Sequence, residues 1–460
     1  MRTALAFAAL LLTATSASAA DSLSTVRQRL AGIEHRAQTQ QDERDIENLQ
    51  RVYGYYFDRS QWDQIADLFA KDGTFEYAQK GVYVGKAHIQ KALALFGPQG
   101  PQPGHADDHL MLQVVVHVSP DGKTAAVRCR DLQMGGDLGG ANHLKEGTYE
   151  NRLVKRGGVW MFSSVHYYAN MSTDFDKGWG TDAQPIETAS TTTPPDRPST
   201  EVYQSYPASH AAPFDFDNPV TGKPIQTTGT YSPADPGAGT IPAAARPSKA
   251  GAGADLTVAQ LTARLAKTRA QIGRVRDYDQ IDNMESAYGY YLDKNLWDQL
   301  ADLFAKDSTM ELAQRGVYQG QDHIRAFLHA FGGAEGPHEN QLGNHLNLQP
   351  VIHVAPDGKT AKVRARVLQM MGQAGKSASM SGAVYENEFV KEDGVWKYKT
   401  DHAYNTWVIN YDGGWAKQTR GTLPGQNKTV PPDRPPSLVF EAFPKVVDVP
   451  IHYKNPVTGR

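Results

Sequence analysis

The chain contains one cysteine, Cys129, among 460 residues. A single thiol cannot build a disulfide framework, a thiolate zinc site or a cysteine-ligated iron–sulfur cluster, so these sites are excluded. The chain also has no large excess of one charge, because it contains 47 Lys and Arg and 50 Asp and Glu. A broadly basic surface for nucleic acid is therefore not expected, and we expect no nucleic-acid partner.

Long apolar runs are also missing. No stretch after residue 20 reaches 18 apolar residues, so we expect no membrane insertion of the mature chain. At the N-terminus, Arg2 precedes a short apolar run over residues 4–12, and small residues follow at 16–20. This order is typical of a secretory signal peptide. We therefore expect residues 1–20 to be removed and the protein to be exported, either periplasmic or secreted.

An internal repeat divides the chain. Its length and its 40% of hydrophobic residues suit two or three packed domains. Residues 53–75 and 288–310 are identical at 16 of 23 positions, at an offset of 235. The offset drifts only to 237 at the motif Asn-Pro-Val-Thr-Gly, which occupies 218–222 and 455–459. The chain is therefore a tandem duplication of one whole domain.

Proline placement predicts the domain boundaries. Of the 27 prolines, 12 lie in residues 185–253 and 8 in residues 417–460. Proline fixes φ and lacks a backbone N–H, so such segments favour extended chain. We predict a first domain at 21–226 with a Pro-rich arm from about 184, a linker at 227–253, and a second domain at 254–460 with an arm from about 417.

Within each copy, the hydrophobic period changes once. Apolar residues of the first copy recur at helical spacing from Ile46 to Phe57 and, after a break near 58–60, from Trp62 to Phe69. A hairpin (74–78 with 82–84), a helix (87–95) and four long strands (109–118, 124–134, 146–155 and 159–168) are expected to follow. Helices followed by a meandering antiparallel sheet predict an α+β domain, in which the curved sheet and the helices enclose a cone. A small-molecule pocket is expected at the open end of each cone.

The residues that carry this order resemble the SnoaL-like branch of the nuclear transport factor 2-like (NTF2-like) superfamily. In the first copy they are Tyr53, Asp58, Trp62-Asp63, Ala66-Asp67-Leu68-Phe69, Asp72, Gly81-Val82-Tyr83, Gly85, His109 and the hairpin from Tyr149 to Trp160. The resemblance covers about 44–180 and 279–416. It implies two tandem cones that pack through their sheets as an intramolecular pseudo-dimer, and it leaves further oligomerisation open. The superfamily includes both enzymes and binding domains, so function must be argued from the site.

Phe57-Asp58 followed by Trp62-Asp63 is also similar to a stretch of the scytalone dehydratase family. In that family an Asp orients a His that acts as general acid and base, and two tyrosines hold a water against the substrate carbonyl. The resemblance implies five catalytic candidates: Asp58, His109, Tyr77, Asp293 and His345. The second copy has Leu312 where the first has Tyr77. If either cone is catalytic, we expect it to be the first.

Six further residues are candidates for ligand binding: Tyr53, Arg130, His166, Tyr288, Arg366 and His402. The two histidines follow aromatic residues on their strands, where they either donate to a ligand or make structural hydrogen bonds. The two arginines either bind a substrate carboxylate or extend from the sheet rim into solvent. For His109 the alternative to catalysis is a polar side chain that fills a gap beside the helix end.

No metal or other cofactor is expected. The run His105-Ala106-Asp107-Asp108-His109 has metal-binding residue types, but the second copy reads Gln341-Leu342-Gly343-Asn344-His345. Three functions remain open. They are a cofactor-independent lyase, isomerase or cyclase acting on a small hydrophobic carbonyl compound, an exported protein that binds such a molecule without turnover, and a protein-interaction module.

Overall fold

The computed structural model describes residues 23–218, 220–225, 256–418 and 421–460. The expected signal peptide (1–20) and the expected linker (227–253) lie outside these residues. Within the described ranges, no helix combines the length and the apolar character needed to cross a membrane.

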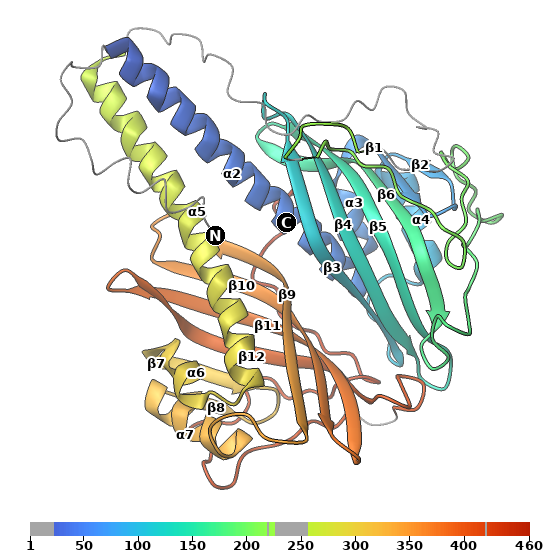
Figure 1. The fold of residues 1–460 in the computed structure, drawn as a ribbon, viewed down its shortest axis with the longest axis vertical. Helices are drawn as coiled ribbons and strands as arrows, with labels where there is room; N and C mark the ends of the chain where they lie inside the picture. The colour runs from blue at the N-terminus through green and yellow to red at the C-terminus, as the bar shows by residue number, and fades with distance from the viewer. Residues whose placement is uncertain (1–22, 219, 226–255, 419–420) are drawn as a thin grey trace.

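Both copies contain the same elements in the same order (Figure 1). The first copy consists of α2 (Leu23–Asp58), α3 (Trp62–Asp67), β1 (Phe69–Tyr77), β2 (Val82–Val84), α4 (Lys86–Leu93), the 3₁₀ turn η1 (Ala94–Phe96), β3 (His105–Val118), β4 (Thr124–Asp137), β5 (Asn142–Arg156) and β6 (Val159–Asp174). The second consists of α5 (Val258–Asp293), α6 (Trp297–Asp302), β7 (Phe304–Leu312), β8 (Val317–Gln319), α7 (Gln321–Gly332), β9 (Gln341–Val354), β10 (Thr360–Gln373), β11 (Ser377–Glu392) and β12 (Val395–Asn410).

Each copy builds one six-stranded sheet, with strand order β2-β1-β6-β5-β4-β3 in the first and β8-β7-β12-β11-β10-β9 in the second. The four long strands form the expected antiparallel meander. However, β1 pairs in parallel with β6, and β7 pairs in parallel with β12. The sheets are therefore mixed, not antiparallel throughout, because the meander returns its last strand beside the first one.

The long helix of each copy packs on its own sheet. In α2, the apolar positions at helical spacing, such as Ile46, Leu49 and Tyr53, are all buried in the core. The helix approaches β3 closely at Gly54, where a Cβ atom would lie 2.8 Å from Cγ of Met111. A glycine suits this contact, because a Cβ atom would clash with Met111 and also with Gln349 of the second domain, whose Nε2 would lie 2.6 Å away.

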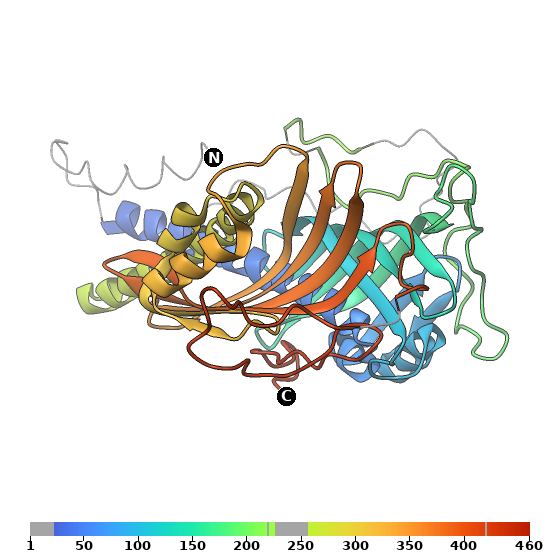
Figure 2. The ribbon, with the colours of Figure 1, turned by 90° about the horizontal axis from the view of Figure 1, so that it is seen from below.

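The two copies also pack on each other. The sheet faces that point away from the cones share one apolar cluster, which contains Leu110 and Met134 of the first copy and Leu368 and Trp407 of the second. The helices α2 and α5 run side by side in the same direction (Figures 1 and 2). They are joined by ion pairs such as Arg264 Nε to Glu34 Oε1, at 2.9 Å. The repeats therefore form an intramolecular pair.

The described residues that follow the last strand of each copy, 175–218, 220–225, 411–418 and 421–460, form no long helix or strand. In the first copy, the backbone N–H of Thr200 donates to Glu76 at 2.8 Å, and Ser437 donates to Glu311 in the same way at 2.7 Å. The C-terminal segment then crosses to the first domain (Figure 2). There the carbonyl of Pro444 accepts the N–H of Gly104 at 2.8 Å.

Candidate active site in the first domain

His109 lies on β3 between two carboxylates. Its ring is buried and packs against Phe57, with centroids 4.1 Å apart. Its Nδ1 lies 3.0 Å from Oδ2 of Asp131, on the neighbouring strand β4. Its Nε2 lies 3.4 Å from Oδ2 of Asp107, two residues earlier on the same face of β3. The imidazole is thus held from both nitrogens by acidic groups.

Asp58 does not make the side-chain contact that was expected with His109. Its Oδ1 accepts the backbone N–H of His109 at 2.6 Å, and its Oδ2 forms an ion pair with Arg366 of the second domain. The imidazole is oriented by Asp131 instead. The reason is position: Asp58 ends α2 and meets the backbone of β3, whereas Asp131 faces into the cone from the adjacent strand.

Asp131 was missed by the sequence analysis, although two signals were available. It alternates along β4 with Cys129 and Gln133, which are buried, so it occupies an inward-facing position. It also replaces an apolar residue of the other copy, Val367. A charged residue at such a position, in only one copy of a repeat, indicates a specific partner inside the fold.

Gln133 connects Asp131 to two tyrosines. Its Nε2 lies 2.8 Å from Oδ2 of Asp131, 2.7 Å from the hydroxyl of Tyr77 and 3.2 Å from the hydroxyl of Tyr167. The amide nitrogen has two N–H bonds and no acceptor, so it donates to two of these three oxygens at a time, and neither phenol donates its proton to it. The phenol protons therefore stay free to donate to a ligand. Burial raises the pKa of both tyrosines well above the ordinary value, so both stay protonated.

The neighbouring carboxylates determine the protonation state of His109. Burial alone would lower its pKa, but the carboxylates of Asp131 and Asp107 outweigh burial and raise the pKa to about 10. Burial would likewise raise the pKa of Asp107, but His109 and His143 hold it well below its ordinary value. At neutral pH the site therefore contains an imidazolium flanked by carboxylate, and His109 is a proton donor in its resting state.

A narrow cavity of about 70 Å³ borders these groups. Tyr77, His109 and Tyr167 line it together with apolar side chains, among them Phe96. Residues 185–187, which follow β6, close part of its rim, and Glu187 there forms an ion pair with Lys80. The cavity thus combines an apolar wall with a few convergent donors, which suits a small and mostly hydrophobic ligand.

A SnoaL-like domain model matches residues 38–166 and 273–402, together more than half of the chain. This chain belongs to the SnoaL-like family. Each match covers the long helix and most of the sheet of one copy, so both copies are SnoaL-like domains. No curated protein sequence matches the chain.

Solved structures similar to one SnoaL-like domain include three from bacteria. A putative scytalone dehydratase from Novosphingobium aromaticivorans DSM 12444 is 26% identical, with 30% of this chain and 90% of that chain covered and a TM-score of 0.27. The hexachlorocyclohexane dehydrochlorinase LinA-type3 from Novosphingobium barchaimii LL02 is 18% identical, with 30% and 92% covered and a TM-score of 0.27. ActVI-ORFA from Streptomyces coelicolor is 16% identical, with 28% and 96% covered and a TM-score of 0.25.

The second SnoaL-like domain keeps the predicted dyad but not its surroundings. Nδ1 of His345 lies 2.9 Å from Oδ1 of Asp293, as expected from the sequence. The other polar groups of the first site are replaced. Asp107, Tyr77, Asp131 and Tyr167 correspond to Gly343, Leu312, Val367 and Ala403. The set of phenols and carboxylates around the cavity of the first domain therefore has no counterpart around His345.

Four of the six predicted ligand-binding residues lie away from the cavity: two are in cores, one is exposed, and one is at the domain interface. The buried hydroxyl of Tyr53 lies 3.5 Å from that of Tyr149, and Tyr288 donates to Asp401 at 2.9 Å. Arg130 is exposed and pairs with Glu146. Arg366 is buried between the two SnoaL-like domains. None of the four lines the cavity of the first domain.

His166 and His402, the remaining two, face the segments that cover the sheets. His166 stacks on Tyr168 with centroids 4.0 Å apart, and burial, assisted by His210, lowers its pKa to about 3. Nδ1 of His402 lies 3.0 Å from the hydroxyl of Tyr404. Neither histidine lines the cavity beside His109. Their environment fits the structural interpretation that the sequence left open.

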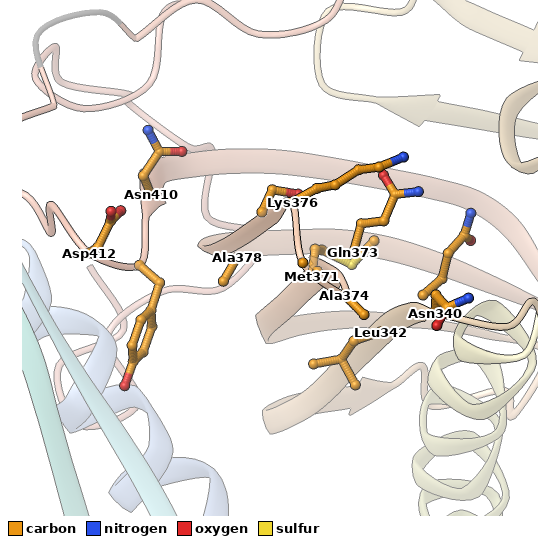
Figure 3. A pocket seen from close by; sticks show the side chains of 14 residues that line it. Asn340, Leu342, Met371, Gln373, Ala374, Lys376, Ala378, Asn410 and Asp412 are labelled. Atoms are coloured by element: carbon orange, nitrogen blue, oxygen red, sulfur yellow. The ribbon is translucent and has the colours of Figure 1, made fainter.

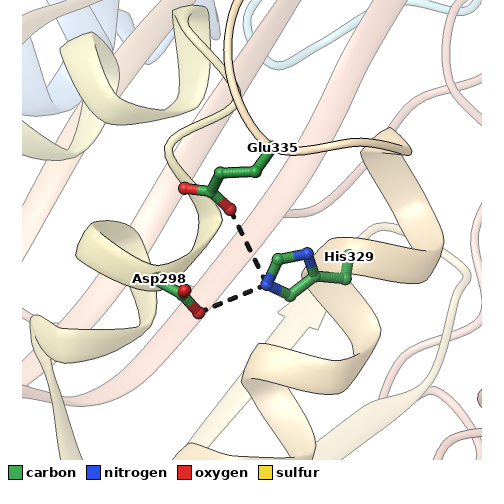
Figure 4. Close-up of side chains that lie close together, drawn as sticks. All are labelled: Asp298, His329 and Glu335. Atoms are coloured by element: carbon green, nitrogen blue, oxygen red, sulfur yellow. Dashed lines mark hydrogen bonds and ion pairs between the residues drawn. The ribbon is translucent and has the colours of Figure 1, made fainter.

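One surface cluster has metal-ligand residue types (Figure 4). Nε2 of His329 lies 3.2 Å from Oδ1 of Asp298 and 3.7 Å from Oε2 of Glu335. Arg325 pairs with the same Oδ1 of Asp298 at 2.9 Å. A guanidinium on this carboxylate neutralises the charge that a cation would need, so ion pairing accounts for the cluster.

Proposed function

We propose that the first SnoaL-like domain binds a small hydrophobic carbonyl compound and acts on it as a cofactor-independent lyase or isomerase. The observation that carries this proposal is the convergence of Tyr77, Tyr167, His109 and Asp107 on one cavity. Nε2 of His109, a residue that lines the cavity, has an ion pair with Asp107 but no hydrogen-bond partner among the described residues. Unpaired buried polar atoms beside a cavity favour a polar group on the ligand.

The arrangement suits elimination of water next to a carbonyl group. The hydroxyls of Tyr77 and Tyr167 donate to the carbonyl oxygen and stabilise the negative charge that develops as the α-proton leaves. The ionised Asp107 accepts that proton, and the imidazolium of His109 protonates the departing hydroxyl, which leaves as water. Asp107 then returns its proton to Nε2 of His109 across 3.4 Å, so both groups regain their resting states. For isomerisation, His109 instead protonates another carbon of the enolate.

Ligand binding without turnover is the second candidate function. The cavity of about 70 Å³ is smaller than the several hundred Å³ typical of ligand sites. Because residues 185–187 close part of its rim, a ligand of substrate size enters only after this segment has moved. Binding of a ligand would then be slow, because it would wait for residues 185–187 to move, and this suits a binding protein.

We also propose that the protein is exported, because residues 1–20 have the order of a signal peptide. A lone, buried Cys129 is compatible with an oxidising compartment, since it needs no partner there. N-terminal sequencing of protein from the periplasm or medium should begin near Ala20 or Asp21. An intact Met1 in that fraction would contradict export by cleavage.

The activity proposal is tested with a panel of small cyclic β-hydroxy ketones and detection of the dehydrated product by mass spectrometry. Purified mature protein should convert at least one of them, and His109→Gln should abolish the conversion. The matched control is His345→Gln at the homologous position, which should keep most of it. Equal losses in the two variants would disprove the assignment to the first domain. Ligand retention without conversion would favour the binding function.

A further inference from the structure

The contact between the two domains is not reciprocal. Tyr55, near the end of α2, is 2% exposed because the second domain covers it, and its hydroxyl donates to the carbonyl of Gln349 at 3.0 Å. The homologous Tyr290, near the end of α5, is 70% exposed. The sheets and the helices α2 and α5 meet through equivalent faces, but the end of α2 is covered by the second domain while the end of α5 is not covered by the first. An asymmetric contact leaves one copy of each surface that is used only once without a partner.

The covered side includes a tryptophan that docks at the strand tips of the first domain. Trp415, in the turn after β12, is 0% exposed and packs on Phe175, with centroids 5.4 Å apart. Its neighbour Ala416 accepts the N–H of Gly139 at 2.8 Å and donates its own N–H to Oδ1 of Asn142 at 2.9 Å. We call the receiving surface, at the tips of β3–β6, the tip groove of the first domain.

The homologous tip groove of the second domain is open. It has a volume of about 870 Å³, and Figure 3 shows Leu342, Met371 and Ala378 along it. Its lining includes Gly375, Ala378 and Tyr411, the counterparts of the three residues that receive Trp415 and Ala416 in the first domain. Leu342, Met371 and Tyr411 are exposed hydrophobic side chains. The groove thus has an apolar part (Leu342, Met371, Ala378 and Tyr411) among polar residues such as Gln373 and Asn410, and its homologue in the first domain accepts a tryptophan turn.

The matching tryptophan turn is also exposed. Residues 175–180 of the first domain are homologous to 411–416, and Trp179 corresponds to Trp415. Its side chain is 55% exposed, whereas that of Trp415 is fully buried. Tryptophan is enriched among the residues that anchor interfaces, and the homologue of this one, Trp415, is buried in such a contact.

We propose that the Trp179 turn (residues 175–180), here called the plug, of one chain docks into the tip groove of the second domain of another chain. The occupant is a second copy of this protein. The Trp179 turn and the tip groove of the second domain are homologous to the Trp415 turn and the tip groove of the first domain, which already fit together within the chain. Repetition of the contact joins chains head to tail. The assembly is then a closed ring or an open filament, depending on whether the rotation closes. This inference is independent of any enzymatic activity.

One substitution weakens the contact between chains relative to the contact within the chain. Asn142, whose side chain accepts the N–H of Ala416, corresponds to Ala378, which offers no acceptor. Gly375 still carries the backbone N–H that would donate to the carbonyl of Gly180. The contact within one chain also benefits from the tether between its domains. Association between chains should therefore depend on protein concentration.

Sedimentation velocity of the full mature chain over a concentration series tests the proposal. The mean mass of the wild type should rise with concentration beyond that of a dimer. Trp179→Ala and Leu342→Asp should each remain monomeric at the same concentrations, with unchanged circular dichroism. Val202→Ala, at a position that is 85% exposed and outside both plug and groove, is the matched control and should assemble as the wild type does.

A mixing experiment tests the head-to-tail geometry. The Leu342→Asp chain keeps an intact plug, and the Trp179→Ala chain keeps an intact groove. An equimolar mixture should therefore form a dimer and nothing larger, because only one productive contact is available. Any of three results would overturn the proposal. The wild type could be monomeric at every concentration, the Trp179→Ala chain could assemble normally, or the mixture could contain no dimer.

Discussion

Nη1 of Arg366, on β10 of the second domain, lies 2.8 Å from Oδ1 of Asp108, on β3 of the first. The same guanidinium pairs with Asp58, which in turn accepts the backbone N–H of His109. Burial raises the pKa of Asp58 to about 7 despite the opposing effect of Arg366. The second domain thus stabilises the end of α2 and the start of β3, where the candidate active site begins.

Removal of Arg366 should destabilise the domain pair strongly. Arg366→Met leaves Asp58 and Asp108 buried without their cation, which we expect to lower the free energy of unfolding by about 3–5 kcal/mol. Urea denaturation measures this. The matched control is Arg130→Met, because Arg130 is homologous but exposed. Its effect should stay within about 1 kcal/mol. Similar losses in both variants would show that the interface charges do not matter.

The protonation state of His109 should depend on Asp131. Asp131→Asn removes the carboxylate that raises the pKa of His109 most, so this pKa should fall from about 10 towards neutrality. NMR titration of the imidazole carbons measures the shift, and any alkaline limit of activity should move with it. Asp293→Asn, which removes the partner of His345, should leave His109 unchanged. An unchanged pKa in Asp131→Asn would refute the assigned pairing.

The hydroxyl of Tyr77 should contribute to turnover, not to folding. Tyr77→Phe keeps the ring, which stacks on Tyr167 with centroids 4.2 Å apart, and removes one donor to the carbonyl oxygen. It also removes one acceptor of Gln133, whose Nε2 keeps Asp131 and Tyr167 as partners. Loss of one such donor lowers kcat by about 10²–10³. Steady-state kinetics and thermal unfolding measure the two effects separately. Tyr149→Phe, a buried tyrosine outside the cavity, is the control and should leave kcat nearly unchanged.

The buried Asp401 of the second domain should make stability depend on pH. Burial raises its pKa from 3.8 to about 7, although Tyr288 donates to it. A group whose pKa is raised on folding favours the folded state below pH 3.8, and this contribution is lost as pH rises through about 7. Asp401→Asn should therefore be more stable than the wild type at pH 9, by roughly 1–4 kcal/mol, and not at pH 4.

Urea denaturation of this variant at both pH values checks the sign. The exposed Asp302→Asn is the control and should show no comparable gain at pH 9. A gain of equal size at pH 4 and pH 9 would mean that the side chain acts through packing and not through its charge.

Several features of the fold follow from local sequence alone. The duplication was predicted from sequence identity between the copies. The C-terminal part of α2 and the four long strands were predicted because hydrophobic periods of 3.6 and 2 reflect the geometry of each element, whereas the extension of α2 back to Leu23 was not predicted. The inward direction of His109 followed from its alternation with the buried Leu110 on β3. The parallel pairing of β1 with β6 was not foreseen, because strand neighbours far apart in sequence leave no local period.

The partner of His109 was decided by tertiary structure. Asp131 meets the ring across a strand pair in which Met111 is opposite Asp131 and His109 opposite Gln133. That contact depends on the register between β3 and β4, which places the two side chains at diagonal positions of the strand pair. The resemblance to the scytalone dehydratase family did not predict it. The resemblance instead assigned the role to Asp58, whose carboxylate is occupied by a backbone N–H and by Arg366.

The different burial of equivalent residues in the two copies best separates what the sequence determines from what the tertiary structure decides. Tyr55 and Tyr290 lie in the identical segment Tyr-Gly-Tyr-Tyr, and Trp179 and Trp415 follow equivalent strands, so the sequence determines the same local structure for each pair. Only the docking of the domains decides that one member is buried and the other exposed. The physical reason is that helices and strands form from contacts near in the chain. Docking instead depends on the summed fit of whole surfaces, and here that fit is not reciprocal.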